Sequence, residues 1–245
     1  MARITIVEEV PLEDPILVEG FPGVGLVGKI AADHLIETYE MLHYANVHCE
    51  GLPRVATYAA ADGSLRTPVR LYADPETGLL VLQSDVPVHP AAAVEFAGCL
   101  AGWIDEEAVL PVYLSGLARE RDASPPELYG VTAGAGDPRV AAADLEAPPE
   151  SGLVSGPTGA MLADALERDA SAVGLIVESD PQFPDPEASS TLIEKGIDPI
   201  AGIDTPIEGL TDQAEEIRDA KEAFARRMQQ ASEESSQAEP LKMYQ

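Results

Sequence analysis

The chain has 245 residues, of which 45% are hydrophobic, and its 43 Asp and Glu against 15 Lys and Arg give a formal net charge of -28. The apolar fraction excludes a disordered acidic tail and predicts a globular protein with a large buried core. Without a basic patch the chain cannot release counterions from phosphates, so we expect neither nucleic acid nor an anionic membrane as a partner.

The carboxylates are spread along the whole sequence, and only four of the basic residues are lysines. At ~1 M ionic strength the Debye length falls to ~3 Å, which largely screens the self-repulsion of such a surface. The composition therefore predicts a protein of a salt-adapted microbe.

Strands and helices are predicted to alternate along the first 206 residues. Apolar runs predict strands at 3–7, 16–19, 42–49, 54–59, 69–73, 79–84, 109–115, 129–133 and 172–178. Helical spacing predicts helices at 24–39, 91–104, 158–168 and 186–195. This alternation favours one α/β layered domain with a mixed sheet covered on both faces. Segment 137–157, rich in Pro, Gly and acids, is predicted to be a long loop or an edge excursion.

After Pro206 the composition of the chain changes. An apolar stripe with helical spacing predicts an amphipathic helix at 207–230, which either docks on its own domain or pairs with another subunit. For pairing, the candidate oligomerisation residues are Leu210, Ile217, Phe224 and Met228. Residues 231–245 are predicted to be a flexible tail, since Ser, Gln and Glu dominate its first ten positions. The expected domains are therefore 1–206, 207–230 and 231–245.

The two cysteines and the apolar runs bear on the cellular compartment. Cys49 and Cys99 are in no CxxC pair and lie in apolar segments, which predicts buried, inert thiols in a reducing compartment. No apolar run approaches the ~20 residues that a membrane span requires, and the first ten residues alternate like a strand. We therefore expect a soluble, cytoplasmic protein.

A glycine-rich turn at residues 20–29 is the strongest local signal. It follows a predicted strand, opens a predicted helix, and has the GxGxxG spacing of a phosphate-binding turn. The turn matches neither known phosphate-binding pattern fully. Read as a P-loop, it has Ile30 in place of the Ser or Thr that holds magnesium. Read as a dinucleotide-binding turn, its acidic residue about 20 positions on would be Glu40, which precedes the next strand instead of ending it. Two hypotheses stay open: the glycines permit a sharp turn and close helix packing, or the loop binds an anion. The candidate loop residues are Gly23, Gly25, Gly28 and Lys29.

Other residues that could carry chemistry have weaker patterns. Ser84, Asp85 and His89 follow a predicted strand, but no GxSxG elbow surrounds the serine. The remaining histidines lack HExxH or another metal spacing; they are His34, His43 and His48. We therefore expect no catalytic residue, no metal site and no cofactor.

Three segments together resemble the archaeal and eukaryotic proteasome assembly chaperone type 2 family. The sequence GFPGVGLVGKIAADHLIE at 20–37 is similar to the amino-terminal signature of that family. Residues 155–162, followed by the strand at 172–178, resemble its second glycine turn, helix and strand. Residues 181–192 resemble its Pro-rich loop and helix. The resemblance covers roughly residues 1 to 230 and identifies a haloarchaeal candidate.

The resemblance implies a three-layer α/β/α phosphorylase-like domain, self-association, no established catalytic activity, and contact with proteasome subunits. In such proteins a carboxy-terminal hydrophobic-Tyr-any motif docks between α-subunits of the proteasome core. Met243, Tyr244 and Gln245 match that motif. The leading hypothesis is therefore a non-enzymatic assembly chaperone or adaptor. The alternative is a nucleotide- or phosphate-dependent enzyme, ATP-grasp-like or phosphorylase-like, that uses the loop from Gly23 to Lys29.

Overall fold

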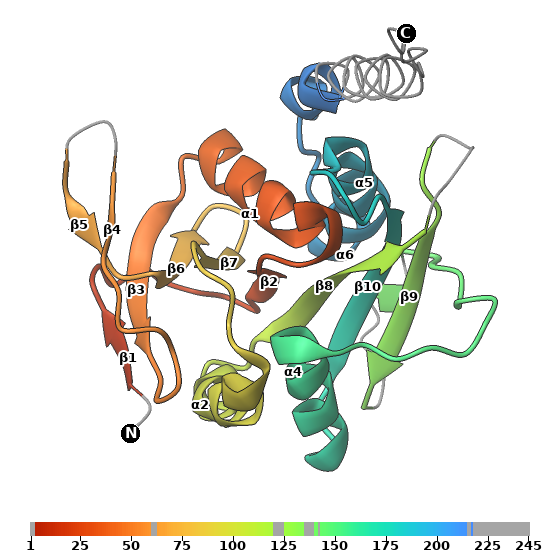
Figure 1. Ribbon diagram of the computed structural model, residues 1–245. Coiled ribbons are helices and arrows are strands. Elements are labelled where there is room, and N and C mark those ends of the chain that lie inside the picture. Colours follow the sequence, from red (N-terminus) through yellow and green to blue (C-terminus); the bar gives the residue numbers. More distant parts are fainter. Residues whose placement is uncertain are drawn as a thin grey trace, which may run out of the picture.

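A mixed sheet organises the computed structural model, which describes residues 3–59, 63–119, 125–134, 140–141, 143–214 and 217. Within these residues the sheet has eight strands in the order β1-β3-β6-β7-β2-β8-β10-β9 (Figure 1). They are β1 (Arg3–Ile6), β2 (Ile16–Gly20), β3 (Leu42–His48), β6 (Val69–Asp74), β7 (Leu79–Ser84), β8 (Leu110–Ala118), β9 (Leu128–Ala133) and β10 (Ala172–Ser179).

The centre of the sheet is parallel and its two edges are antiparallel. β2 runs parallel to β7 and β8, and β8 runs parallel to β10. β6, β3 and β1 extend one side antiparallel, and β9 closes the other. Every residue of β2, β6 and β7 is buried, as expected for strands that are covered on both faces.

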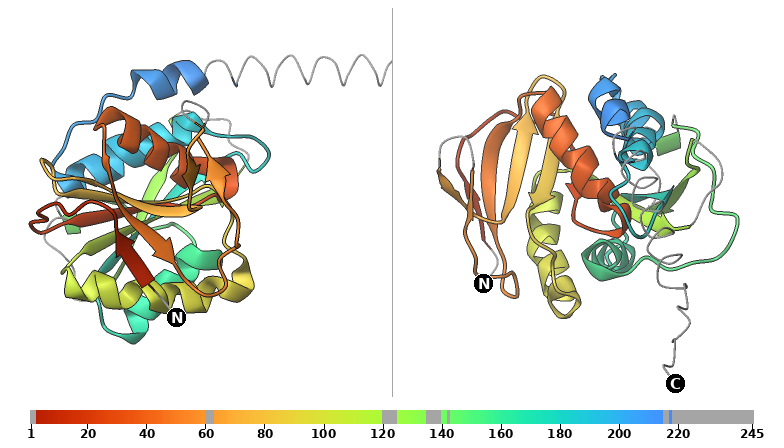
Figure 2. Two further views of the ribbon diagram at one scale, coloured as in Figure 1. Left: turned by 90° about the vertical axis from the view of Figure 1, so that its left-hand side faces the viewer. Right: turned by 45° about the horizontal axis from the view of Figure 1, so that its top comes forward.

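Helices cover both faces of the sheet (Figures 1 and 2). On one face lie α1 (Val27–Thr38), α5 (Pro186–Leu192), a π-helical turn (Ile193–Ile197) and α6 (Asp198–Ala201); on the other lie α2 (Ala93–Glu106) and α4 (Gly156–Glu167). Short 3-10 turns, Val24–Leu26 and Pro90–Ala92, precede α1 and α2. Side chains of β2 alternate between the two cores, with Val18 in one and Leu17 in the other. The predicted three-layer α/β/α architecture is confirmed.

One predicted strand became a separate hairpin. Of residues 54–59 only β4 (Thr57–Tyr58) is a strand, and it pairs with β5 (Leu65–Arg66), which the sequence did not indicate. These two-residue strands are too short to show the alternation of apolar and polar residues by which a strand is predicted. Within segment 137–157, of which 137–139 and 142 lie outside the described residues, Glu146 bridges Tyr129 of β9. The excursion therefore returns to the edge of the sheet.

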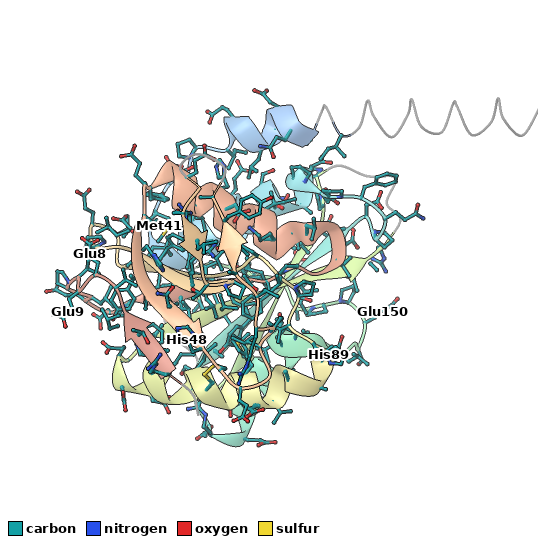
Figure 3. The ribbon with its side chains drawn as sticks, turned by 60° about the vertical axis from the view of Figure 1, so that its left-hand side comes forward. Glu8, Glu9, Met41, His48, His89 and Glu150 are labelled. Carbon is teal, nitrogen blue, oxygen red and sulfur yellow. A yellow bond between two sulfur atoms is a disulfide. The ribbon has the colours of Figure 1, made fainter. Side chains whose placement is uncertain are left out.

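The prediction for the cysteines was wrong. Cys49 and Cys99 are half-buried and form a disulfide, with their Cα atoms 6.1 Å apart (yellow bond in Figure 3). The bond forms because the turn after β3 lies against the start of α2: a Cβ on Gly51 would lie 2.6 Å from that of Ala92. The argument for a reducing compartment from free thiols therefore no longer applies.

The predicted carboxy-terminal helix begins on the domain itself. Residues 208–214 and 217 are helical, and Leu210 is 2% exposed in the core formed with α1 and α5. The rest of the predicted helix, with Phe224 and Met228, and the tail at 231–245 lie outside the described residues. Of the helices described, none is long and apolar enough to cross a membrane.

Candidate functional site

The glycine turn lies at the carboxyl edge of β2, where open α/β sheets place ligands. The strand β2 ends at Gly20, the 3-10 turn follows, and α1 begins at Val27. The predicted order of strand, turn and helix is therefore confirmed. Backbone amides at such a position can bind a phosphate.

The glycines bring the turn into close contact with its surroundings. Gly25 has a φ of 61°, and a Cβ there would lie 1.9 Å from Ser179 Oγ at the end of β10. A Cβ on Gly20 would lie 2.0 Å from that of Ala32 in α1. At Gly28 the nearest atom would be the Phe21 carbonyl oxygen, 3.3 Å away. The space beside the turn is thus filled by the protein itself, whereas a Cβ on Gly23 would meet nothing within 4 Å.

A buried aspartate joins the turn to β10 and α5. The backbone N–H of Asp185 donates to the Gly25 carbonyl oxygen at 2.8 Å. Its carboxylate, in a residue 4% exposed, accepts from Ser179 Oγ at 3.2 Å and from the backbone N–H groups of Asp180 and Ala188, both at 3.1 Å. Asp185 is the N-cap of α5, so one residue fixes the helix start with its side chain and the turn with its backbone.

A second carboxylate lies beneath the turn in β2. Glu19 is 1% exposed and accepts hydrogen bonds from the backbone N–H of Phe21 and from Thr158 Oγ1, both at 3.0 Å. Burial raises the pKa of Glu19 to about 7, and these bonds, with one from the backbone of Leu114, limit the rise. Glu19 thus joins β2 to the first turn of α4, which lies on the face of the sheet opposite α1.

Lys29 is the cation that an anion-binding loop would use, and it is already paired. Its Nζ lies 2.6 Å from Asp33 Oδ1 and 3.8 Å from Asp85 Oδ1. With Glu19 and Asp185 also adjacent, the charges around the turn are mainly carboxylates. These contacts favour the first hypothesis, in which the glycines serve the turn and the helix packing.

The other predicted candidates have separate partners. Ser84 Oγ donates to the Val86 carbonyl oxygen at 2.6 Å, Asp85 pairs with Arg70 at 2.8 Å, and His89 Nδ1 accepts from the backbone of Ala91 at 3.1 Å. Each of the three side chains is therefore held by a different neighbour.

The histidines are equally dispersed. His34 Nε2 donates to the Pro206 carbonyl oxygen at 2.6 Å, and His43 Nε2 lies 3.1 Å from Asn46 Oδ1. Figure 3 places His48 and His89 at different sites on the surface. Among the described residues, no group of three His, Cys, Asp or Glu could hold a metal ion.

Sequence reasoning missed the buried polar residues that build the site. Glu19, Thr158 and Asp185 come from different elements, and Arg70, 3% exposed, is the second residue of β6. A charged residue inside an otherwise apolar strand was the available signal for Glu19 and Arg70, because buried charges need partners. The partners that join them to other elements are Thr158 for Glu19 and Gln83 and Asp85 for Arg70, and no local spacing reveals these.

Comparison with known proteins identifies the family to which this chain belongs. The family model described as PAC2 family matches residues 17–225. The chain belongs to the PAC2 family. An uncharacterized protein of Methanocaldococcus jannaschii is 25% identical over 221 residues, which are 89% of this chain and 88% of that protein.

Solved structures show the same PAC2 fold over nearly the whole chain. Pyrococcus furiosus PbaA, an archaeal homolog of proteasome-assembly chaperone, has a TM-score of 0.78 at 21% identity and covers 96% of this chain and 95% of its own. PbaB of the same organism, an archaeal proteasome activator, has a TM-score of 0.77 at 20% identity, over 91% and 98%. At these identities the likeness establishes the fold.

Proposed function

We propose that this protein is a non-enzymatic, proteasome-associated assembly chaperone or adaptor. The observation that carries the proposal is the PAC2 family match over residues 17–225. It is supported by the shared fold with structures described as a proteasome-assembly chaperone homolog and a proteasome activator. The α/β/α body is then a scaffold, and the partner is the proteasome core.

The glycine turn supports a scaffold better than the alternative enzyme. An anion at residues 23–29 would approach the carboxylates of Glu19 and Asp185, and Lys29 would have to leave Asp33. Titration of the chain with nucleotides and inorganic phosphate tests this part of the proposal. We expect no saturable heat of binding; a micromolar dissociation constant would favour the enzyme.

Docking is assigned to the last three residues of the sequence, Met243, Tyr244 and Gln245, which lie outside the described residues. The assignment rests on their match to the hydrophobic-Tyr-any motif. A tyrosine ring and an apolar side chain supply buried contact area, and a terminal carboxylate supplies a charge-assisted hydrogen bond. We place this contact between α-subunits of the proteasome core.

Replacing the tyrosine tests the docking directly. We expect Tyr244→Ala to weaken binding to assembled proteasome core from the same organism by about 30-fold, because buried aromatic anchors contribute ~2 kcal/mol or more at interfaces. The stability of the fold, measured by thermal melting, should change by no more than roughly 0.5 kcal/mol, as is usual for a surface substitution. Binding is measured on immobilised core particle at the working salt of the organism.

A chain with one Gly added after Gln245 is the matched variant, since it keeps every side chain and moves only the carboxylate. We expect it to bind as weakly as Tyr244→Ala. High salt screens a lone charge, so direct hydrogen bonds and ring burial must carry the contact. Equal affinities for the unmodified chain and both variants would refute docking by the tail.

Self-association through the carboxy-terminal helix is the second part of the proposal. Leu210 already packs in its own core and Ile217 is half-buried, so the stripe begins on the domain. We expect Phe224→Asp, which puts a charge on the stripe, to shift the chain toward smaller species in light scattering at high salt. An unchanged mass would mean that the stripe only docks on its own domain.

A further inference from the structure

The hairpin β4–β5 stands outside the eight-stranded sheet. Among the described residues its strands pair only with each other, and Figure 1 shows it projecting beside β3. Tyr58 lies opposite Leu65, and the two side chains are 78% and 76% exposed. Opposite residues of a hairpin share one face, so they form a single exposed apolar pair. A two-stranded hairpin is marginally stable in water, so burying this pair against a partner would stabilise it.

The base of the hairpin is fixed to the body by Arg70, which is 3% exposed. Its Nη1 donates to the carbonyl oxygen of Thr67 and lies 3.5 Å from Thr57 Oγ1, both at the hairpin base. Its Nη2 donates to Gln83 Oε1 at 2.6 Å and to Asp85 Oδ2 at 2.8 Å, both from the end of β7 or just after it. The guanidinium therefore holds the hairpin in one orientation while the apolar pair stays exposed.

A groove of about 320 Å³ separates the hairpin from α1. The α1 wall includes Ile36 and the exposed Glu37, and the hairpin wall includes Tyr58 and the exposed Arg66. Within the described part of the chain, neither Glu37 nor Arg66 makes an ion pair. The hairpin and the α1 wall together form one patch, with the apolar pair on one face of the hairpin and two unpaired side chains of opposite charge on the two walls of the groove.

We propose that this patch pairs with the same patch on a second copy of the chain. A two-fold axis would bring the hairpin of each copy over the groove of the other, burying Tyr58 and Leu65. Arg66 would then face Glu37 of the partner subunit. Such an isologous contact requires a self-complementary surface, and this patch carries one exposed side chain of each charge. The contact is independent of the proteasome role and uses none of the residues of the carboxy-terminal stripe.

Measuring the mass of the full chain in solution tests whether the apolar pair contributes to the proposed contact. We expect Tyr58→Asp to raise the dissociation constant of the pair by about 30-fold in sedimentation equilibrium, since it removes an aromatic anchor. Leu166→Asp is the matched control, because Leu166 is 64% exposed on α4, on the opposite face of the sheet. It should associate like the unmodified chain. Circular dichroism and melting confirm that both variants are folded.

Charge exchange tests the geometry. At ~0.1 M salt, where the Debye length is ~10 Å, Arg66→Glu and Glu37→Arg should each weaken association. The double variant should restore it, and it has the same net charge as the unmodified chain. Lys195→Glu, at an exposed position on the π-helical turn, changes the net charge as Arg66→Glu does and should have a much smaller effect.

Three results would overturn the proposal. The first is an unmodified chain that stays monomeric at its highest soluble concentration. The second is a Tyr58→Asp chain that associates as strongly as the unmodified chain. The third is a double variant that associates no better than the weaker of its two single variants. None of these results bears on docking by Tyr244, so failure here and failure of the proteasome proposal are distinguishable.

Discussion

Gly25→Val should destabilise the protein by about 3 kcal/mol or more, the largest single-residue effect we expect at the turn. The φ of 61° disfavours any L side chain, and most strongly a β-branched one. The new Cβ would also lie 1.9 Å from Ser179 Oγ and 3.3 Å from the Asp180 carbonyl oxygen, both backed by β10. Relief would require the turn to separate from β10 and Asp185. Urea denaturation measures the loss.

Gly23→Ala is the matched control for Gly25→Val. Gly23 has extended backbone angles, with a φ of -145°, and a Cβ there would meet nothing within 4 Å. Its free energy of unfolding should change by no more than about 0.5 kcal/mol. If both variants were equally stable, the close contact of Gly25 with Ser179 would not be a determinant of the fold.

The layers of the fold could be predicted because they depend on local patterns. Strands such as β7 are continuous apolar runs, and α1 follows a turn whose glycines are adjacent in sequence. Where a helix or strand stopped was less predictable. The helix expected at 186–195 continues instead through a π-helical turn to Ala201, and at Gly196 a Cβ would lie 2.6 Å from Leu175 of β10. That close approach depends on how the helix packs on β10, which local sequence does not indicate.

The contacts that fill the candidate site from other elements could not be predicted, because they join residues far apart in the chain. Gly25 looked like part of a phosphate loop until β10 brought Ser179 against it. Lys29 looked like a free cation, although Asp33, one helical turn away, offered a partner at the i+4 position. The disulfide likewise required β3 and α2 to be placed. Sequence therefore located the turn, and only the fold showed what fills it.

Glu19 should make the stability of the protein depend on pH between about 4.5 and 7. Its pKa is raised from 4.5 to about 7 in the folded chain, chiefly because burial penalises the charged carboxylate. Below pH 4.5 both folded and unfolded chains are protonated, and the stability from this group is fully present. It is lost as the pH rises through 7, because the unfolded chain ionises first. The difference is about 3 kcal/mol by linkage.

Glu19→Gln isolates this contribution from those of the other carboxylates. The amide keeps the shape, its oxygen can still accept from Phe21, and it carries no charge at any pH. We expect the variant to be more stable than the unmodified chain at pH 8 and to lose this advantage toward pH 5. Urea unfolding across this range gives the difference at each pH. Glu37→Gln, at an exposed position of α1, is the control and should give a difference near zero throughout. A difference for Glu19→Gln that is the same at pH 5 and pH 8 would contradict a raised pKa, because only a group that titrates differently in the two states changes the slope of stability with pH.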